Sequence, residues 1–318
     1  QGRVLELVNR DNEKNCCGFG SFYDPATILV GSEGTLAVVT EMELRLAFPP
    51  PAAFLGMAFF PEMRCALDFV VEARNNSRLR PTSMEFLDEG ALGIIRTRAE
   101  GLSIPRSARV MVYFDQEYGG EKDRERFLER WFRLIERHTT LSADTQIALT
   151  EGQKRHLRDL RHRVPESMNE QSARAVKNGG CKISTDWAVP YTRLHELFAY
   201  YDSIRHLLGE IPIVQYGHIG QGHPHFNFIA GNSEERHVAE QVDVLMARKA
   251  VELGGTIAAE HGIGKLKAEH LSIQYPEPVI EAMKAVKRTF DPKGILAPGN
   301  ILPGRISSRT GVLWPWTK

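Results

Sequence analysis

The chain has 318 residues, 42% of them hydrophobic and 25% charged, and its 40 basic side chains balance its 40 acidic ones. This length suggests about two domains with enough apolar residues for a sizeable core. The balanced charge argues against a nucleic-acid-binding surface, and no apolar run approaches the roughly 20 residues of a membrane-spanning helix.

The first 48 residues predict a glycine-rich, strand-forming segment. Thr27–Val30 and Ala37–Leu46 carry β-branched or alternating apolar residues on either side of the turn Gly31–Gly34. Pro49–Pro51 then end the segment, because three fixed φ angles forbid a helix and stiffen the chain. We therefore expect a domain boundary at this point.

After the prolines, the order of elements is typical of a split βαβ unit. Its expected strands are Phe54–Phe60, Thr82–Leu87, Val110–Phe114 and Thr145–Leu149, and its expected helices are Glu62–Ala73 and Gly120–His138. In the second helix, Phe127, Trp131, Leu134 and Ile135 follow the helical period.

A basic, mostly helical insertion, Gln153–Gly180, separates this unit from a second copy. The second copy predicts strands at Ile183–Val189, Ile211–Tyr216 and His225–Ala230, and helices at Tyr191–Leu208 and Ser233–Leu253, the latter with a capping box at Asn232 and Glu235. The tail predicts a helix up to about Phe290 and a Pro/Gly-rich segment, Asp291–Pro303. The whole pattern indicates an α+β fold with antiparallel sheets and helices on one face, a duplicated ferredoxin-like arrangement, rather than a parallel doubly wound sheet.

Three of the eleven histidines fall between positions 218 and 225. Two glycines and Pro224 between His218 and His225 indicate a chain reversal that makes the flanks neighbouring strands. Facing imidazoles in a hairpin lie close enough to share one cation. His223 and His225 share a strand face and form a competing pair, and a turn decorated with polar residues is the simpler alternative.

The segment Gly254–Lys265 places Glu260 beside His261 in a glycine-rich stretch that follows a helix. A carboxylate next to an imidazole suits a metal ligand beside a general base, and a His₂-carboxylate set leaves coordination positions open for a substrate. A loop that ends a helix explains the glycines equally well, so the segment is informative only together with the histidine cluster.

Two further features are weaker. Arg158, Arg161 and Arg163 precede Lys182, and arginine suits bidentate binding of a carboxylate, but a solvated arginine row on a helix is the simpler explanation. Gly31–Thr35 offers backbone N–H groups to a phosphate or ring carbonyl, yet it matches neither a P-loop nor the dinucleotide-binding fingerprint.

Taken together, these segments resemble the flavin-linked oxidases of the vanillyl-alcohol-oxidase superfamily, type-4 branch. Within it they are most similar to the D-lactate, glycolate and D-2-hydroxyglutarate dehydrogenase group. The similar segments are Gly31–Leu36 with Val39–Glu41, Arg161 with Lys182–Pro190, His218–Asn227, Gly254–Lys265 and Phe290–Gly299. The resemblance implies that residues 1–48 are the end of an FAD-binding (PCMH-type) domain, 49–270 the cap or substrate-binding domain, and 271–318 a helix and tail that return to the flavin domain.

The resemblance also implies an activity, the FAD-dependent oxidation of a D-2-hydroxy acid to the 2-oxo acid. In that family a divalent metal, zinc or manganese, is held by residues matching His218, His225 and Glu260, and the match to His261 removes the hydroxyl proton. Residues matching Arg161 and Lys182 hold the substrate carboxylate. The expected flavin contacts are Gly31, Ser32, Glu33, Gly34, Thr35 and Val39.

The expected partners are a small 2-hydroxy acid and an electron acceptor, which is a quinone, an electron-transfer flavoprotein or a cytochrome, with a homodimer as the expected assembly. Four cysteines, two of them adjacent, are too few for a disulfide scaffold, and no segment has the layout of a signal peptide. We therefore expect a cytoplasmic protein, either free or peripheral at the inner face of a membrane.

The sequence departs from the family pattern in several places. Gln221 and His223 replace the usual Asp and Asn, Ala297 replaces a common Asn near the flavin, and Pro165 replaces a substrate-contacting threonine of some relatives. The family's N-terminal subdomain with its pyrophosphate loop has no match, so, with Gln1 at the start, we expect a fragment, a truncated product or one half of a split enzyme. Two alternatives remain, an alkyl-dihydroxyacetonephosphate-synthase-like flavoenzyme and a non-catalytic metal-binding partner subunit.

Overall fold

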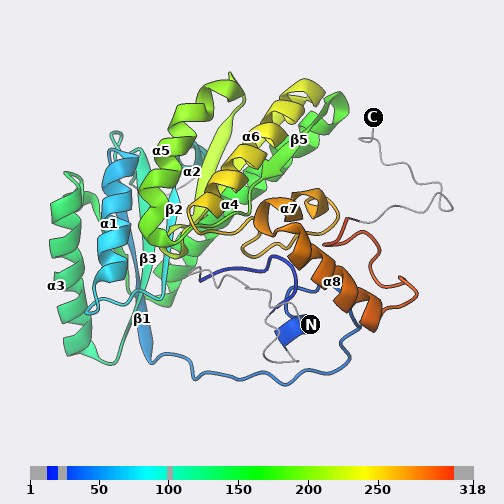
Figure 1. The fold of residues 1–318 in the computed structure, drawn as a ribbon. Coiled ribbons are helices and arrows are strands. Elements are labelled where there is room, and N and C mark those ends of the chain that lie inside the picture. The colour runs from blue at the N-terminus through cyan, green and yellow to red at the C-terminus, as the bar shows by residue number, and fades with distance from the viewer. Residues whose placement is uncertain (1–12, 21–26, 99–102, 304–318) are drawn as a thin grey trace. The chain divides into compact units, whose positions relative to one another are not determined.

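The computed structural model describes residues 13–20, 27–98 and 103–303 (Figure 1). The chain forms two compact units, and each is described by itself. Of the described residues, the sheet unit comprises 13–14, 45–98 and 103–256, and the terminal unit comprises 15–20, 27–44 and 257–303. The domain boundaries expected at residues 48 and 270 stay a prediction.

The sheet unit contains one seven-stranded sheet in the order β4-β1-β3-β2-β6-β7-β5, and every neighbouring pair is antiparallel. The strands are β1 (Ala52–Phe60), β2 (Ser83–Leu87), β3 (Val110–Tyr118), β4 (Gln146–Ala148), β5 (Gly179–Ser184), β6 (Ile213–His218) and β7 (His223–Asn232). The antiparallel α+β class is therefore confirmed.

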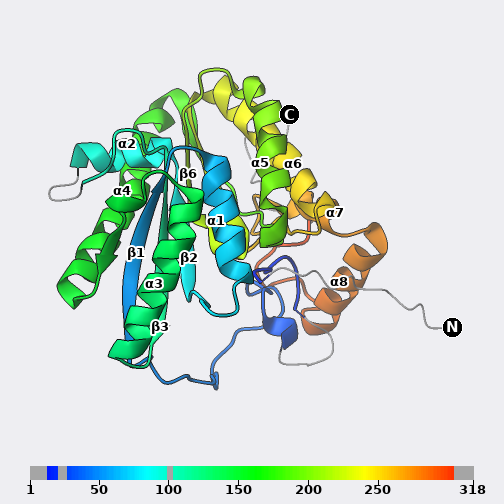
Figure 2. The ribbon, with the colours of Figure 1, turned by 90° about the vertical axis from the view of Figure 1, so that its left-hand side faces the viewer.

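Helices cover both faces of this sheet, because the apolar side chains of its strands alternate between two cores (Figures 1 and 2). One face carries α1 (Met63–Asn75), α3 (Glu121–His138), α5 (Leu194–Ile204) and α6 (Ser233–Glu252), and the other carries α2 (Glu89–Arg98) and α4 (Glu151–Ala175). On the first face Phe60 of β1 lies against Phe69 of α1, with ring centroids 5.1 Å apart. On the second, Leu55 and Phe59 share a core with Leu160 of α4.

We expected helices on one face of the sheet only, but α2 and α4 cover its second face. The helix α4 is the predicted insertion, and it buries Leu157, Leu160, Val164 and Met168 against the sheet. The helix α2 was not predicted, because Gly90 and Gly93 interrupt its sequence. Apolar residues on both sides of the central strands require this second cover.

Three of the expected strands differ from the structure. Thr27–Leu29 is a 3₁₀ turn, and Ala37–Leu46 contains no strand although its sequence alternates. A strand forms only where a neighbour accepts its backbone hydrogen bonds, and no described strand pairs with this segment. The strand expected at Ile183–Val189 corresponds to β5, which ends at Ser184. Beyond it, Ala188 makes only an isolated bridge to Thr256.

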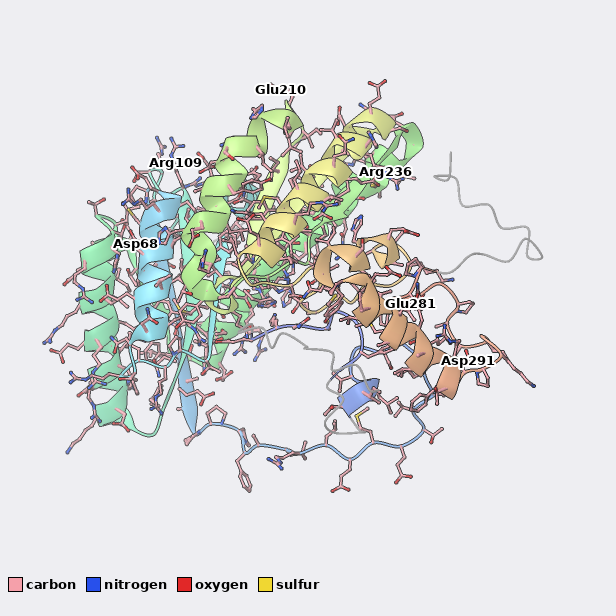
Figure 3. All side chains as sticks on the ribbon, in the orientation of Figure 1. Asp68, Arg109, Glu210, Arg236, Glu281 and Asp291 are labelled. Atoms are coloured by element: carbon pink, nitrogen blue, oxygen red, sulfur yellow. The ribbon has the colours of Figure 1, made fainter. Side chains whose placement is uncertain are left out.

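The terminal unit is held together by α8 (Glu277–Phe290) and the residues around it. Asp291, labelled in Figure 3, directly follows α8 and accepts hydrogen bonds from the backbone of Ile295 and Leu296. Lys287 of α8 pairs with Asp291 and also donates to the carbonyl oxygen of Thr35, at 2.7 Å. Among the described helices, none is both long and apolar enough to cross a bilayer.

Candidate functional site

The predicted histidine hairpin is confirmed by the pairing of β6 with β7. His218 lies directly opposite His223, and Tyr216 lies directly opposite His225. The reversal passes through the short turn Ile219–Gln221 and Gly222, whose φ of +69° is left-handed. A side chain is excluded at Gly222, because a Cβ atom there would lie 1.8 Å from the carbonyl oxygen of Val189.

All three imidazoles of the hairpin gather in one cluster. The ring centroid of His218 lies 5.9 Å from that of His223 and 5.8 Å from that of His225, and the rings of His223 and His225 are 4.3 Å apart. His223 and His225 are buried, and His218 retains 25% of its side-chain exposure. The cluster is therefore open to solvent on the His218 side.

The ring nitrogens of the three histidines have different partners. His225 Nδ1 lies 3.1 Å from the carbonyl oxygen of Thr185, and His218 Nδ1 lies 3.3 Å from a carboxylate oxygen of Glu85. Both partners are acceptors, so they favour a proton on Nδ1 and a lone pair on Nε2, the arrangement of a metal-binding histidine. His223 instead turns Nε2 toward the buried carboxylate of Asp186, at 3.3 Å. This difference favours His218 and His225 over the pair His223 and His225.

The expected carboxylate-binding arginine lies next to this cluster. Arg161 comes from α4, and its Nε atom forms an ion pair with a carboxylate oxygen of Glu85, at 2.5 Å. Glu85 therefore contacts both Arg161 and His218 with its two carboxylate oxygens. The neighbours Arg158 and Arg163 are exposed, which fits a solvated row for those two positions.

Lys182 projects from β5, one strand away from the histidines. Its Nζ atom donates to Asn169 of α4 at 2.7 Å, and its backbone N–H donates to Ser172. Burial lowers the pKa of the Lys182 ammonium from its ordinary value, because desolvation disfavours the charged form. The structure therefore places Arg161 beside the histidine hairpin through their shared contact with Glu85. Lys182 pairs in the sheet with Ile229, four residues along β7 from His225.

Sequence reasoning missed two polar residues of this sheet. Glu85 stands alone between Met84 and Phe86 in an apolar strand, and Asn227 stands between Phe226 and Phe228. Both are buried, and the Asn227 amide donates to the carbonyl oxygen of Val214 at 3.2 Å. A single polar residue inside an apolar strand is the signal that finds such positions, because burying it without a partner is costly.

The terminal unit holds Glu260 and His261 in the glycine-rich loop. His261 Nε2 lies 3.5 Å from a carboxylate oxygen of Glu260. The carboxylate of Glu33 accepts hydrogen bonds from the backbone N–H groups of Ile263 and Gly264, at 2.6 and 2.7 Å, and so fixes the end of this loop.

Within the predicted flavin-contacting turn, side chains are engaged inside the unit. The Thr35 hydroxyl donates to the carbonyl oxygen of Ser32 at 2.6 Å, and the Glu33 carboxylate is bound to the glycine-rich loop. Val39 is 53% exposed. The assignment of Gly31–Thr35 and Val39 to the flavin stays a prediction. At Glu33 and Thr35 the predicted contact would be made by backbone atoms, because both side chains are already hydrogen-bonded.

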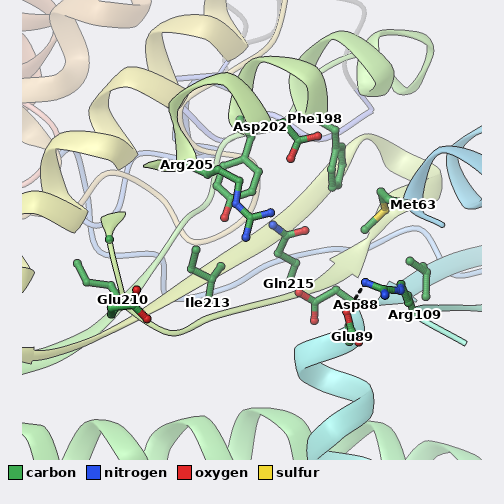
Figure 4. A pocket seen from close by; sticks show the side chains of 14 residues that line it. Met63, Asp88, Glu89, Arg109, Phe198, Asp202, Arg205, Glu210, Ile213 and Gln215 are labelled. Carbon is green, nitrogen blue, oxygen red and sulfur yellow. Dashed lines mark hydrogen bonds and ion pairs between the residues drawn. The ribbon is translucent and has the colours of Figure 1, made fainter. Parts of the chain in front are cut away.

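A separate hollow of 470 Å³ lies on the α1 and α5 side of the sheet unit (Figure 4). Phe198 and Asp202 of α5 line it together with Gln215 and Asp88, the residue before α2. Burial raises the pKa of Asp88 to about 7, against the effect of the hydrogen bond from Ala91. None of the predicted site residues lines this hollow.

The chain is similar to known flavoenzymes along most of its length. The family described as FAD linked oxidases, C-terminal domain, matches residues 49–301. The glycolate oxidase subunit GlcD of Bacillus subtilis is 30% identical over 88% of this chain and 57% of its own length. The D-lactate dehydrogenase of Archaeoglobus fulgidus is 28% identical over 95% and 62%, and the mitochondrial D-2-hydroxyglutarate dehydrogenase of Arabidopsis thaliana is 25% identical over 96% and 52%.

Solved structures share the fold at lower identity. An alkyldihydroxyacetonephosphate synthase superposes with a TM-score of 0.58 at 16% identity, over 86% of this chain and 49% of its own. A p-cresol methylhydroxylase superposes with a TM-score of 0.52 at 12% identity, over 80% and 53%. The chain thus spans about half the length of many of the proteins that it matches.

Proposed function

The chain belongs to the family of FAD-linked oxidase C-terminal domains, and from this premise we propose that it is the substrate-binding part of an FAD-dependent D-2-hydroxy-acid dehydrogenase. One observation carries the proposal. His218 and His225 both have Nδ1 against an acceptor, while Arg161 of α4 contacts the same Glu85 carboxylate as His218 and Lys182 projects from β5 of the same sheet. The names of the relatives, which include glycolate, D-lactate and D-2-hydroxyglutarate enzymes, support the substrate class.

His218 and His225 fit a divalent cation, because each would offer Nε2 while Nδ1 is bound elsewhere. We assign the third ligand to Glu260. It follows Thr256 by four residues, and Thr256 is fixed to Ala188 by a backbone bridge, so the chain keeps Glu260 within about 14 Å of that bridge. Two imidazoles and a carboxylate suit zinc or manganese. When bound, such a cation lowers the pKa of the substrate hydroxyl group.

The remaining residues orient the substrate and move its proton. Arg161 and Lys182 bind the substrate carboxylate and so fix the direction of its Cα–H bond. His261 accepts the hydroxyl proton as the general base. FAD, when bound, would supply the two-electron acceptor that the conversion of the alcohol to the 2-oxo acid requires. The electron acceptor, the homodimer and the cytoplasmic location stay predictions.

Metal analysis of purified variants tests the ligand assignment. We expect about one equivalent of zinc or manganese in the parent chain, loss of the metal in His218→Ala, His225→Ala and Glu260→Gln, and retention in His237→Ala, an exposed histidine of α6 that serves as the control. Loss in His223→Ala with retention in His218→Ala would favour the competing pair. Full retention in both His218→Ala and His225→Ala would contradict the metal site.

His261→Asn separates an enzyme from a non-catalytic metal-binding subunit. The variant should keep its metal but slow turnover of D-lactate, D-2-hydroxyglutarate or glycolate by about 10²–10⁴-fold, the effect of losing a general base. The assay is flavin reduction at neutral pH in a preparation that contains FAD and any further segment that the activity requires. Turnover equal to that of the parent would show that His261 is not the base.

A further inference from the structure

Glu85 is a buried carboxylate between two predicted functional residues. It is 6% exposed, with one carboxylate oxygen 3.3 Å from His218 Nδ1 and the other 2.5 Å from Arg161 Nε. We propose that Glu85 is a positioning residue that sets the ring nitrogen with which His218 binds the metal and the edge with which Arg161 binds the substrate carboxylate. This inference rests on the proposed function, and it adds a connection between the metal and the carboxylate subsites.

The contact with His218 selects one tautomer of the imidazole. A carboxylate accepts hydrogen bonds and donates none, so the facing nitrogen, Nδ1, has to carry the proton. The lone pair of a neutral His218 then lies on Nε2. The carbonyl oxygen of Thr185 has the same effect on His225, at 3.1 Å from its Nδ1. Two independent acceptors thus prepare two neighbouring imidazoles for the same cation.

The contact with Arg161 selects an orientation of the guanidinium. Binding through Nε leaves the two terminal amino groups as the donor pair that matches a carboxylate. Leu160 and Val164 on the same helix are buried in the core, so this face of α4 is anchored against the sheet. What remains to be set is the direction of the Arg161 side chain, and the contact with Glu85 sets it.

The surroundings of Glu85 make these contacts rigid. Glu85 lies in β2, which stands between β3 and β6 in the sheet, and its direct partner in β3 is Tyr113. Burial raises the pKa of the Tyr113 hydroxyl above its ordinary value, so water has little access to this partner of Glu85. Charge-assisted hydrogen bonds are stronger in such surroundings than in water.

The sheet unit offers a matched control. Glu72 of α1 also bridges an arginine and a histidine, Arg137 and His138, and its carboxylate lies 2.7 Å from His138 Nε2. This second bridge is 41% exposed at Glu72 and joins α1 to α3 on the opposite face of the sheet. Glu72→Gln therefore makes the same chemical change away from the predicted site.

The test combines zinc titration by calorimetry with nitrogen-15 spectra of the histidine rings in the metal-free chain. Glu85→Gln should weaken zinc binding about 10–100-fold, the usual effect of removing the partner of a metal-binding histidine, whereas Glu72→Gln should leave the affinity within twofold. Binding of D-lactate to the zinc-loaded chain should weaken in Glu85→Gln as well. In the spectra, His218 should carry its proton on Nδ1 in the parent and lose that preference in Glu85→Gln. The resonance is assigned by its loss in His218→Ala.

The two readouts separate this inference from the proposed function. Parent-like zinc affinity in Glu85→Gln, or a parent His218 protonated on Nε2, would overturn the positioning role while leaving the metal site intact. A parent chain that binds no zinc but shows the expected tautomer and its change would overturn the metal site and keep the role of Glu85. If Glu85→Gln does not fold, Glu85→Asp retains the charge, and its shorter reach should weaken zinc binding in the same direction.

Discussion

Gly262 occupies a backbone conformation and a space that suit only glycine. Its φ is +79°, and an added Cβ atom would lie 2.5 Å from the Glu33 carboxylate oxygen that binds Ile263. Glu33 cannot move aside without releasing its two backbone hydrogen bonds, to Ile263 and Gly264. Gly264 also has a positive φ, +56°, but no described atom lies within 4 Å of the position that a Cβ atom would take there.

We therefore expect Gly262→Ala to destabilise the terminal unit more than Gly264→Ala. Left-handed backbone costs an alanine about 1–2 kcal/mol at either position, and crowding adds about 1–3 kcal/mol at Gly262 alone. Urea unfolding, followed by hydrogen exchange at the Ile263 amide, measures the difference. Equal losses of stability in the two variants would show that Glu33 does not confine the loop.

Asp291 gives the terminal unit a dependence on acid pH. Its hydrogen bond from Lys287, assisted by the backbone N–H groups of Ile295 and Leu296, lowers the pKa of the carboxyl from its ordinary 3.8 to about 2. A lowered pKa in the folded state stabilises the fold above pH 4, and this contribution is lost as the pH falls from about 4 to about 2. Asp291→Asn should reduce the slope of stability against pH in this window, as measured by urea unfolding between pH 2 and 5. An unchanged slope would contradict the pairing.

At the scale of elements, Pro165 is an interior residue of α4. A proline has no N–H group, so the carbonyl oxygen of Arg161, four residues earlier, has no helical donor from this position. The helix is thus weakened at the turn that carries the predicted carboxylate-binding residue.

Pro165→Ala should raise the free energy of unfolding by about 1–2 kcal/mol, because the restored hydrogen bond outweighs the greater freedom of the unfolded chain. Urea unfolding and amide exchange in α4 measure the effect. Glu166→Ala, at the neighbouring position, is the control and should change stability by less than about 0.5 kcal/mol. A loss of stability in Pro165→Ala would mean that the proline ring contributes packing that alanine cannot replace.

Elements with a strong local period could be predicted from the sequence. The helix α3 and the β6–β7 hairpin lie where their periodicity and turn residues placed them, since 3.6-residue spacing and glycine-rich reversals are local signals. The strand predicted at Ala37–Leu46 is absent from the structure. Its alternation is also local, but a strand needs hydrogen bonds from a neighbour, and local sequence does not supply one.

The same distinction applies to the site. His218 and His225 could be paired from the sequence because one hairpin contains both. Glu85 could not be placed beside them, since it meets His218 only through the pairing of β2 with β6, over 130 residues away in the chain. Arg161 reaches the same carboxylate from α4, on a helix whose face toward the sheet is set by tertiary packing.

At the scale of the whole molecule, residues 38–48 leave a row of apolar side chains in solvent. Met42, Leu44, Leu46 and Phe48 alternate along the chain, and their exposed fractions run from 65% to 99%. Single exposed apolar residues are common, but a contiguous row favours association. This chain therefore has a surface that promotes contact with another apolar surface, including that of a second copy.

The triple variant Met42→Thr, Leu44→Thr and Leu46→Thr should reduce self-association and the binding of a hydrophobic dye. It should leave the unfolding transition almost unchanged, because these side chains bury little area in the fold. Threonine at Val30, Leu207 and Leu266, which are exposed but scattered, is the matched control and should leave association as it is in the parent. Sedimentation velocity over a range of concentrations measures the assembly. A parent chain that stays monomeric at every concentration and binds no dye would contradict the role of this row, since an uncovered apolar surface of that length should be detected by at least one of the two measurements.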